Sequence, residues 1–290
     1  MNNSPCREDL KFKNTTISVV IAAFNGEKFI LKLLESISIQ THQVDEIIVC
    51  DDCSADNTIK VLHGFKLKYP HLNVRIINNR SRLGVTKNFS KAIKLSKCEL
   101  IFLADQDDIW HQNKVQVMFD AYSNGNCSYL ISDMNILNLN EGLEKFTWAE
   151  LMKNNYGIGK NDLMNGCAVV ATKKFFRSCL PVPYGKAHDV WFAYCAKRLK
   201  TRAFLEAPLM SYRVGPQGMT SFNFVDNLKL NERNVELSPN SNFKTLMKQE
   251  KKILLIIIKL FMHLHFIFVV IRFRSFKRSN VTIGKQNHGR

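Results

Sequence analysis

The stretch ISVVIAAFNGEKFILKLLESISIQTHQVDEIIVCD, residues 17–51, predicts a strand, a helix and a second strand. Its two ends, 17–22 and 46–51, are short runs rich in Val and Ile, which is typical of buried strands. Between them, apolar residues recur at helical spacing over 27–40. Two buried strands joined by a helix predict a parallel sheet with crossover helices, and therefore an α/β fold.

The same alternation continues along the chain. A helix is predicted to open at 54–57, with Ser54 or Asp56 as its N-cap, and to end near Leu67. The elements that follow are predicted at 73–78 (strand), 86–96 (helix), 99–104 (strand), 112–123 (helix), 127–133 (strand), 165–172 (strand), 187–199 (helix) and 202–206 (strand). Residues 134–164 carry no pattern that orders them.

The composition suits a globular enzyme. The 290 residues are 46% hydrophobic and 23% charged, which is enough for one substantial core. The eight cysteines show no disulfide-framework spacing, and the N-terminus lacks the apolar region of a secretory signal. We therefore expect a reducing, cytoplasmic location.

The net charge of +16 is concentrated at the C-terminus. Residues 244–290 hold 11 Lys or Arg and one acid, Glu250. They flank a nearly continuous apolar run, 253–271, which we expect to lie on the cytoplasmic face of an anionic membrane. A single span and a helix docked in the protein core are the alternatives. Because the basic excess lies beside an apolar run, and not on a sheet with exposed aromatic residues, no nucleic-acid partner is expected.

Acidic residues follow two of the predicted strands. Ligands of open α/β sheets collect outside the carboxyl ends of the strands, so Phe24, Asp51–Asp52 and Asp105–Asp108 should share one crevice. If 105–108 is extended, Asp105 and Asp107 face one side and Gln106 the other. Two such carboxylates suit Mg²⁺ or Mn²⁺. The alternative is that Asp107 or Asp108 caps the helix near 112, and Asp51 has the same alternative for its own following helix.

Four motifs resemble one known family in order and spacing. They are ISVVIAAFNGEKFI, IIVCDDCSADNT, Arg82-Leu83-Gly84 with Lys87-Asn88, and FLADQDDIW. Together they resemble glycosyltransferase family 2, especially its rhamnosyltransferase-like members, over roughly residues 16 to 220. The resemblance implies a GT-A fold, with a Rossmann-like, mostly parallel nucleotide-binding half and an acceptor-binding half.

The resemblance also implies a domain plan. Residues 1–15 would form a polar tail and residues 16–225 the GT-A domain. Within that domain, 16–110 would bind the nucleotide sugar and 111–225 the acceptor. Residues 226–290 would form a helical, basic and hydrophobic segment that associates with the membrane.

Donor-binding roles carry over to five positions. Ala22 and Phe24 match residues beside the base, with Phe24 stacking on it, although Phe24 alone would suit ordinary core packing. Asp52 matches the acid that accepts the pyrimidine N–H. Arg82 and Lys87 are placed to meet ribose or phosphate, although exposed basic residues are commonly just solvated.

Metal and catalytic roles carry over to the acidic loop and to one later carboxylate. Asp107 matches the metal ligand, Asp105 the partner that touches ribose or metal, and Asp108 a nearby support. Asp189 matches the general base, with helix N-capping as its alternative. Trp191 would form a wall for the acceptor sugar or be packed in the core.

The stretch YRVGPQGMTSF, residues 212–222, departs from the family pattern. Gly215 stands where a His is frequent. Any phosphate or metal contact from this loop must therefore come from Arg213, Gln217 or the backbone. His188, beside the expected base, is the nearest alternative histidine.

The function that the resemblance implies is inverting, metal-dependent transfer of a hexose. The first candidate donor is thymidine-diphosphate rhamnose (dTDP-rhamnose), and the acceptor a saccharide or lipid-linked saccharide of cell-surface polysaccharide synthesis. A nucleotidyltransferase with the same acidic site is an alternative, but AAFNGEK offers only Lys28 and no Gly-rich loop. The other alternative is a non-catalytic, basic protein that binds membranes or nucleic acid.

Overall fold

The computed structural model describes residues 15–125, 127–138 and 142–214, all within one compact unit. The predicted tail, apart from Thr15, lies outside the described residues, and so does the whole segment 226–290 with its apolar run. No helix within the described ranges is long and apolar enough to cross a membrane.

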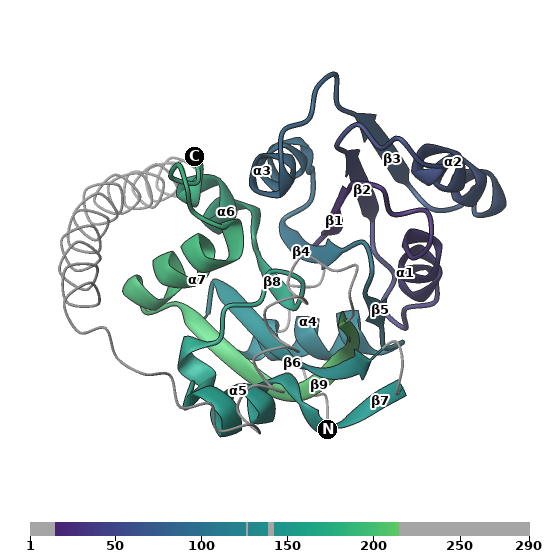
Figure 1. Cartoon of the computed structure of the whole chain (residues 1–290). Coiled ribbons are helices and arrows are strands. Elements are labelled where there is room, and N and C mark those ends of the chain that lie inside the picture. The colour runs from purple at the N-terminus through teal and green to yellow at the C-terminus, as the bar shows by residue number, and fades with distance from the viewer. Residues whose placement is uncertain (1–14, 126, 139–141, 215–290) are drawn as a thin grey trace, which may run out of the picture. The chain divides into compact units, whose positions relative to one another are not determined.

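Four parallel strands form the first half of the sheet (Figure 1). They lie in the order β3 (Val74–Asn78), β2 (Glu46–Asp51), β1 (Ile17–Ala23) and β4 (Leu100–Asp105). All residues of β2 are buried, as are nearly all of β1 and β4, which explains why their sequences are continuous apolar runs. The predicted Rossmann-like half is confirmed.

The second half of the sheet mixes strand directions. β8 (Val169–Thr172) is antiparallel to β4 and also to β6 (Tyr129–Asn138). β9 (Arg202–Val214) runs parallel to β6 and then pairs with the short β5 (Ile109–Trp110). β7 (Gly142–Thr147) pairs with the C-terminal end of β6, on the side opposite β9. One nine-stranded sheet thus runs through both halves of the described unit.

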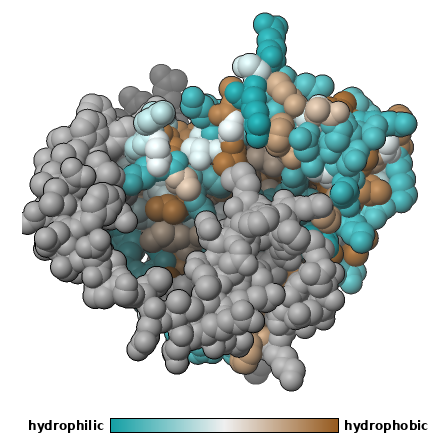
Figure 2. All heavy atoms as spheres, viewed as in Figure 1, coloured by the Kyte–Doolittle hydropathy of each residue, from teal (hydrophilic) through white to brown (hydrophobic). Residues whose placement is uncertain are grey.

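Helices cover both faces of the parallel strands. α1 (Ile30–Ser38) and α2 (Thr58–Lys68) contact each other on one side, and α3 (Val85–Leu95) packs on β1 and β2 from the other (Figure 1). The remaining helical elements are α4 (Lys114–Asn124), α5 (Trp148–Tyr156), the 3₁₀ turn η1 (Lys160–Asp162), α6 (Lys173–Cys179) and α7 (His188–Arg198). Hydrophilic side chains cover β3, α2 and the loop between β3 and α3 in the view of Figure 2.

Two local predictions are wrong. The N-cap of α2 is Asn57, without a side-chain cap bond, because Ser54 donates instead to the Asp51 carboxylate and Asp56 accepts from the Thr58 N–H one position early. The strand predicted to end before Pro208 continues to 214. A shift of register between Ser132 and Asp133 on β6 lies opposite Pro208, so the residue without an N–H falls at an irregularity of the ladder.

Candidate active site

The site begins where β1 and β4 end side by side. In register, Ala22 lies opposite Asp105 across this pair, and Ala23 lies opposite Asp51 on the other side. The chain order reverses here, since β2 and β3 lie to one side of β1 and β4 to the other. The carboxyl ends of these strands therefore deliver the acidic residues to one edge, as the sequence predicts.

A cation covers the aromatic ring after β1. The guanidinium carbon of Arg82 lies 3.8 Å from the centroid of the half-buried Phe24 ring. A ring with a cation over one face is at the surface of the site and is not core packing. The predicted stacking of Phe24 on a base stays a prediction, and Arg82 is now placed beside it.

Asp52 holds the loop that precedes α3. Its buried carboxylate accepts from the N–H groups of Leu83 (2.7 Å) and Gly84 (2.8 Å) and from the Asn79 side-chain amide (2.9 Å). Gly84 has a φ of 80°, which a residue with a side chain adopts only under strain. A pyrimidine N–H that bound Asp52, as predicted, would be a fourth hydrogen-bond donor to a carboxylate that already accepts three.

Asp51 fixes the turn after β2. Its carboxylate accepts from the Ser54 N–H at 3.0 Å and from the Ser54 hydroxyl. It does not cap α2, which begins at Thr58. The helix-capping alternative for Asp51 is therefore wrong.

Gln106 clamps the end of β1 to the acidic loop. Its side-chain oxygen accepts from the Phe24 N–H, and its side-chain nitrogen donates to the Phe24 carbonyl, both at 2.9 Å. A Cβ on Gly26 would lie 2.4 Å from the same Gln106 oxygen, so the close approach requires glycine there. The clamp fixes the backbone beside the Phe24 ring.

The acidic loop is a turn and not an extended segment. The Asp108 N–H donates to the Asp105 carbonyl, and the Asp105 N–H donates to the Asp108 carboxylate, both at 3.3 Å. A turn brings residues three apart together, so the expectation that 105–108 is extended is wrong. A shared ion between Asp105 and Asp107 stays a prediction, since the charge of Asp107 still acts on Asp105. The helix-capping alternative is also wrong, because α4 is capped at Asn113.

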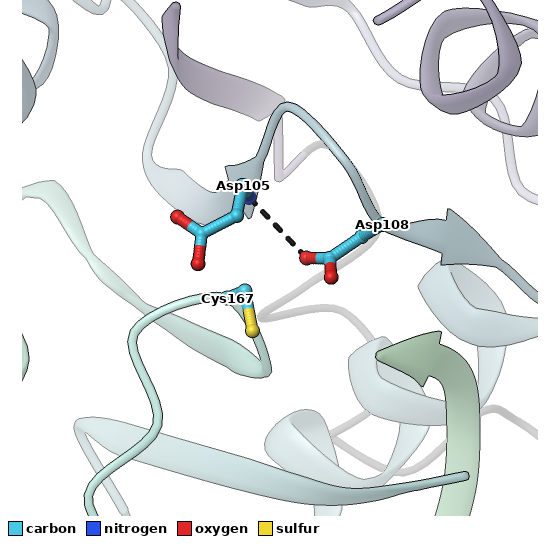
Figure 3. A group of neighbouring side chains, drawn as sticks. All are labelled: Asp105, Asp108 and Cys167. Carbon is cyan, nitrogen blue, oxygen red and sulfur yellow. Dashed lines mark hydrogen bonds between the residues drawn. The ribbon is translucent and has the colours of Figure 1, made fainter. Parts of the chain in front are cut away.

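Three donors converge at this turn (Figure 3). Carboxylate oxygens of Asp105 and Asp108 and the sulfur of the buried Cys167 all lie within 4.8 Å of one another. Cys167 comes from the segment just before β8. One oxygen of Asp108 is buried without a hydrogen-bond partner among the described residues. Two carboxylates, one with a buried unpaired oxygen, form a donor set that fits a divalent cation.

The electrostatics also favour a cation here. Burial, followed by the charges of Asp107 and Asp189, raises the pKa of Asp105 to about 7. Burial likewise raises the pKa of Asp107, and the Arg213 charge opposes that rise. Burial lowers the pKa of the adjacent Lys114 to about 8, so this ammonium compensates the carboxylates only weakly above that pH. Bound cations would restore the ionised carboxylates.

Arg213 joins β9 to the acidic loop. Its Nε donates to the Asp107 carbonyl at 2.9 Å, and its guanidinium carbon lies 4.9 Å from the Phe29 ring centroid. Its Nη2 is buried without a hydrogen-bond partner among the described residues. An unpaired guanidinium N–H beside the metal loop is suited to an anionic group such as a diphosphate. Gly215 and Gln217 lie outside the described residues.

Asp189 lies in the first turn of α7, close to the acidic loop. The N-cap of α7 is Ala187, so the capping alternative for Asp189 is wrong. A Cβ on Gly166 would lie 3.2 Å from the Asp189 Cβ and 2.9 Å from His188 Nε2. The His188 ring stacks on Phe89, and both of its nitrogens are buried without partners in the described part of the chain.

Two further predicted contacts involve Trp191 and Lys87. Trp191 is fully buried and donates through its indole N–H to the Cys179 carbonyl at 2.8 Å, so it is packed and forms no acceptor wall. Lys87 is exposed on α3 and lines a groove with Leu83 and Pro181. The predicted contact of Lys87 with ribose or phosphate stays a prediction.

Sequence comparison agrees with this architecture. The family model described as Glycosyl transferase family 2 matches residues 18–178, more than half of the chain. The chain belongs to this family.

Curated relatives match over the same half. WfgD of Escherichia coli, a UDP-Glc:alpha-D-GlcNAc-diphosphoundecaprenol beta-1,3-glucosyltransferase, is 30% identical over 150 residues, 49% of this chain and 57% of that protein. The dTDP-rhamnosyl transferase RfbG of Shigella flexneri is 37% identical over 114 residues, 37% of this chain and 39% of that protein. The matches thus span only about half the length of these family 2 relatives.

Solved structures share the GT-A fold. The mannosyltransferase PcManGT of Pyrobaculum calidifontis, in complex with GDP-Man and Mn²⁺, has a TM-score of 0.59 and 14% identity, covering 90% of this chain and 73% of that chain. TarS 1-349 of S. aureus with UDP-GlcNAc has a TM-score of 0.56 and 19% identity, covering 77% and 68%. The predicted GT-A fold is confirmed for this family 2 chain.

Three site residues of this family 2 chain escaped the sequence reasoning. Gln106 was predicted only to point away from the metal, and its clamp on the Phe24 backbone depends on a contact between two loops. Cys167 and Gly166 lie in a run predicted to be a strand. The signal available was the Asn-Gly pair at 165–166, which marks a turn before a strand.

Proposed function

We propose that this chain is an inverting, metal-dependent hexosyltransferase that uses a nucleoside-diphosphate sugar as donor. One observation carries the proposal: the acidic loop and Asp189 flank the same short segment, 165–167. Cys167 lies within 4.8 Å of donor atoms of the loop, and Gly166 abuts Asp189. The negative charge of Asp189 also contributes to the raised pKa of Asp105, as expected for two carboxylates that lie close together.

The residues divide the chemistry between them. Asp105 would hold the divalent ion together with Asp107, and when bound the ion neutralises charge that develops on the departing diphosphate. Arg213 would donate its unpaired N–H to the same diphosphate. Asp189 would accept the proton of the acceptor hydroxyl, which then attacks the anomeric carbon from the face opposite the leaving group and inverts it.

The nucleotide would lie across the carboxyl ends of β1 and β2. The small Ala22 side chain would lie beside the base, and the Phe24 ring would stack on the base. Arg82 would lie toward the phosphates. Asp52 would accept the pyrimidine N–H while it holds the loop before α3. Lys87 stays the weakest of these donor contacts, because the structure places it along an outer groove.

The first candidate donor is dTDP-rhamnose, which the similarity to RfbG supports. WfgD is named for UDP-Glc and a lipid-diphosphate acceptor, so UDP-glucose is the second candidate, and a saccharide or lipid-linked saccharide is the proposed acceptor. We place the reaction in cell-surface polysaccharide synthesis at the cytoplasmic face of a membrane, with Mn²⁺ or Mg²⁺ as the ion.

A donor panel tests the activity. Purified chain is incubated with dTDP-rhamnose, UDP-glucose, UDP-GlcNAc and GDP-mannose, with Mn²⁺, Mg²⁺ or chelator, and the released products are separated. Release of nucleoside diphosphate with one donor supports the proposal. Release of sugar 1-phosphate would instead identify transfer of the nucleotidyl group, and the absence of both donor binding and turnover would exclude an enzymatic function.

Three variants and one control test the residue roles. Asp107→Ala should lose metal-dependent donor binding, whereas Asp189→Ala should keep binding and lose transfer by about 10²- to 10⁴-fold, the range of general-base catalysis. Asp162→Ala, at an exposed ion pair with Lys197, is the control and should change neither. Equal loss of donor binding in the Asp107 and Asp189 variants would refute the assignment. Mn²⁺ binding to Asp108→Asn, read by electron paramagnetic resonance, shows whether Asp107 or Asp108 shares the ion with Asp105.

A further inference from the structure

A basic surface in the described unit extends beyond Arg82 and Lys87, the two of its bases that the proposed reaction uses. Between Asp56 and Glu99 the chain contains ten Lys or Arg and no Asp or Glu. They are Lys60, Lys66, Lys68, Arg75, Arg80, Arg82, Lys87, Lys91, Lys94 and Lys97. A run of this kind with no acid predicts a strong local positive potential, which attracts an anionic partner.

α3 gathers three of these bases on one side. Lys87, Lys91 and Lys94 are spaced by four and three residues, so they share a face of the helix. Together with Thr86 and Ser90 they line a groove of about 510 Å³. The groove is bounded by Pro181 and Val182, which follow α6, and by Leu83 and Leu95 along α3. Its lining contains no acidic residue.

α6 extends the same positive surface. Its sequence, KKFFRSC, has three bases and no acid, and Arg177 donates to the Lys94 carbonyl at 2.8 Å, which joins α6 to the end of α3. Among the described residues, no carboxylate forms an ion pair with a lysine of the groove. Lys91 donates to the Asn79 side chain at 2.6 Å, while Lys87 and Lys94 are exposed. Within the described ranges, the positive charge of the groove is therefore not balanced by an ion pair.

The lining selects among anions. Lysine ammonium groups bind phosphates as point charges. With a free phosphate in the groove, the four apolar residues would stay exposed to water. With a phosphate that carries an alkyl chain, they would pack against the chain and be buried. A single-stranded nucleic acid would need aromatic side chains for its bases, and none lines the groove. An amphiphilic phosphate matches both parts of the lining.

We propose that the groove between α3 and Pro181–Val182 binds the phosphate headgroup of an anionic membrane lipid. The phosphate contacts Lys91 and Lys94, and the adjoining chain lies against Leu95 and Val182. The transferase domain thus has its own docking point on an anionic bilayer, in addition to any contribution of residues 226–290.

Vesicle binding by the full chain tests this docking point. Lys91→Gln/Lys94→Gln is compared with wild type on phosphatidylcholine vesicles with and without phosphatidylglycerol. Each lysine near an anionic surface is worth about fivefold in partitioning, so the double variant should bind about 25-fold more weakly to phosphatidylglycerol vesicles. The C-terminal segment is present in every protein, so the difference belongs to α3.

The control removes the same charge elsewhere. Lys60→Gln/Lys66→Gln changes two exposed lysines of α2, across the sheet from α3, and should change binding by less than twofold. An equal loss in both double variants would show only a net-charge effect and overturn the proposal. Lys94→Gln alone changes an exposed side chain and should weaken binding to phosphatidylglycerol vesicles about fivefold. This single variant keeps the hydrogen bond between Lys91 and Asn79, so its effect does not depend on a disturbed Asn79.

Three further outcomes would also overturn it. In the first, wild-type protein binds vesicles equally well with and without phosphatidylglycerol. In the second, inorganic phosphate at the concentration of lipid phosphate displaces the protein from the vesicles. In the third, the double variant loses binding to an RNA oligonucleotide but keeps its binding to vesicles. No donor or acceptor is present in these assays, so a negative result leaves the proposed transfer reaction untouched.

Discussion

Gly166→Ala should slow transfer while leaving donor binding intact. Gly166 lies between the acidic loop and the start of α7, where an added Cβ would sit 2.9 Å from His188 Nε2 and 3.2 Å from the Asp189 Cβ. Ordinary contacts of this kind begin at 3.4 Å, so the start of α7 must move by about 0.5 Å. The His188 ring cannot easily yield, because it is buried against Phe89.

The size of the effect follows from that shift. A displacement of 1 Å in a catalytic group can cost about 10²-fold in rate, so about 0.5 Å at Asp189 should lower kcat about tenfold. Overpacking of this kind should also cost about 1–3 kcal/mol in the free energy of unfolding. Donor affinity should not change, because Phe24 and Asp52 directly follow β1 and β2 and Asp105 ends β4, so none of them belongs to α7.

The assay measures three quantities on each protein. They are kcat with the best donor of the panel, donor Kd by calorimetry, and stability by urea unfolding. Gly64→Ala is the control: it lies inside α2 with nothing within 4 Å of its added Cβ, and should raise stability by about 0.5–1 kcal/mol without altering kcat. The reasoning fails if Gly166→Ala keeps wild-type kcat, or if donor affinity falls as much as kcat does.

Two further predictions concern the acidic loop. The pKa of Asp105 is raised from 3.8 to about 7, so its ionised form is disfavoured in the apoprotein. The contribution of this group to the stability of the fold is therefore largest below pH 4 and is lost as the pH rises toward 7. Metal binding needs the ionised form, so Mn²⁺ affinity should rise with pH up to about 7 and then level off; a flat profile between pH 5 and pH 7 on calorimetric titration would contradict this. Gln106→Ala removes both hydrogen bonds to the Phe24 backbone. It should lower the free energy of unfolding by about 1–3 kcal/mol and weaken donor binding. Unchanged nucleotide affinity would show that these hydrogen bonds do not organise the base site.

The central strands could be predicted from the sequence because they are buried on both faces. Glu46–Asp51 was predicted to the residue, and the other parallel strands to within one or two residues. Residues 134–164 gave no such signal, since within the described ranges β7 pairs only with β6. Their order depends on tertiary pairing, which a local pattern does not encode.

The site was predictable only in part. Strand ends meet at one edge of any parallel sheet, so the convergence of Asp51 and Asp105 follows from the fold. The pairing of Asp105 with Asp108 depends on one turn. Cys167 lies beside them because it directly precedes β8, which pairs with β4 although it is more than sixty residues farther along the chain. Contacts of this kind come from packing between the two halves, which periodicity does not reveal.

The side-chain amide of Gln106 adds no charge to a loop that already holds three carboxylates. Only an amide of that length presents an acceptor and a donor at once, as the backbone of a neighbouring strand would. Hydrolysis of this amide to a carboxylate would set an oxygen against the Phe24 carbonyl and add a fourth negative charge to the turn. Deamidation of Gln106 alone would therefore both release the end of β1 and crowd the carboxylates of the loop.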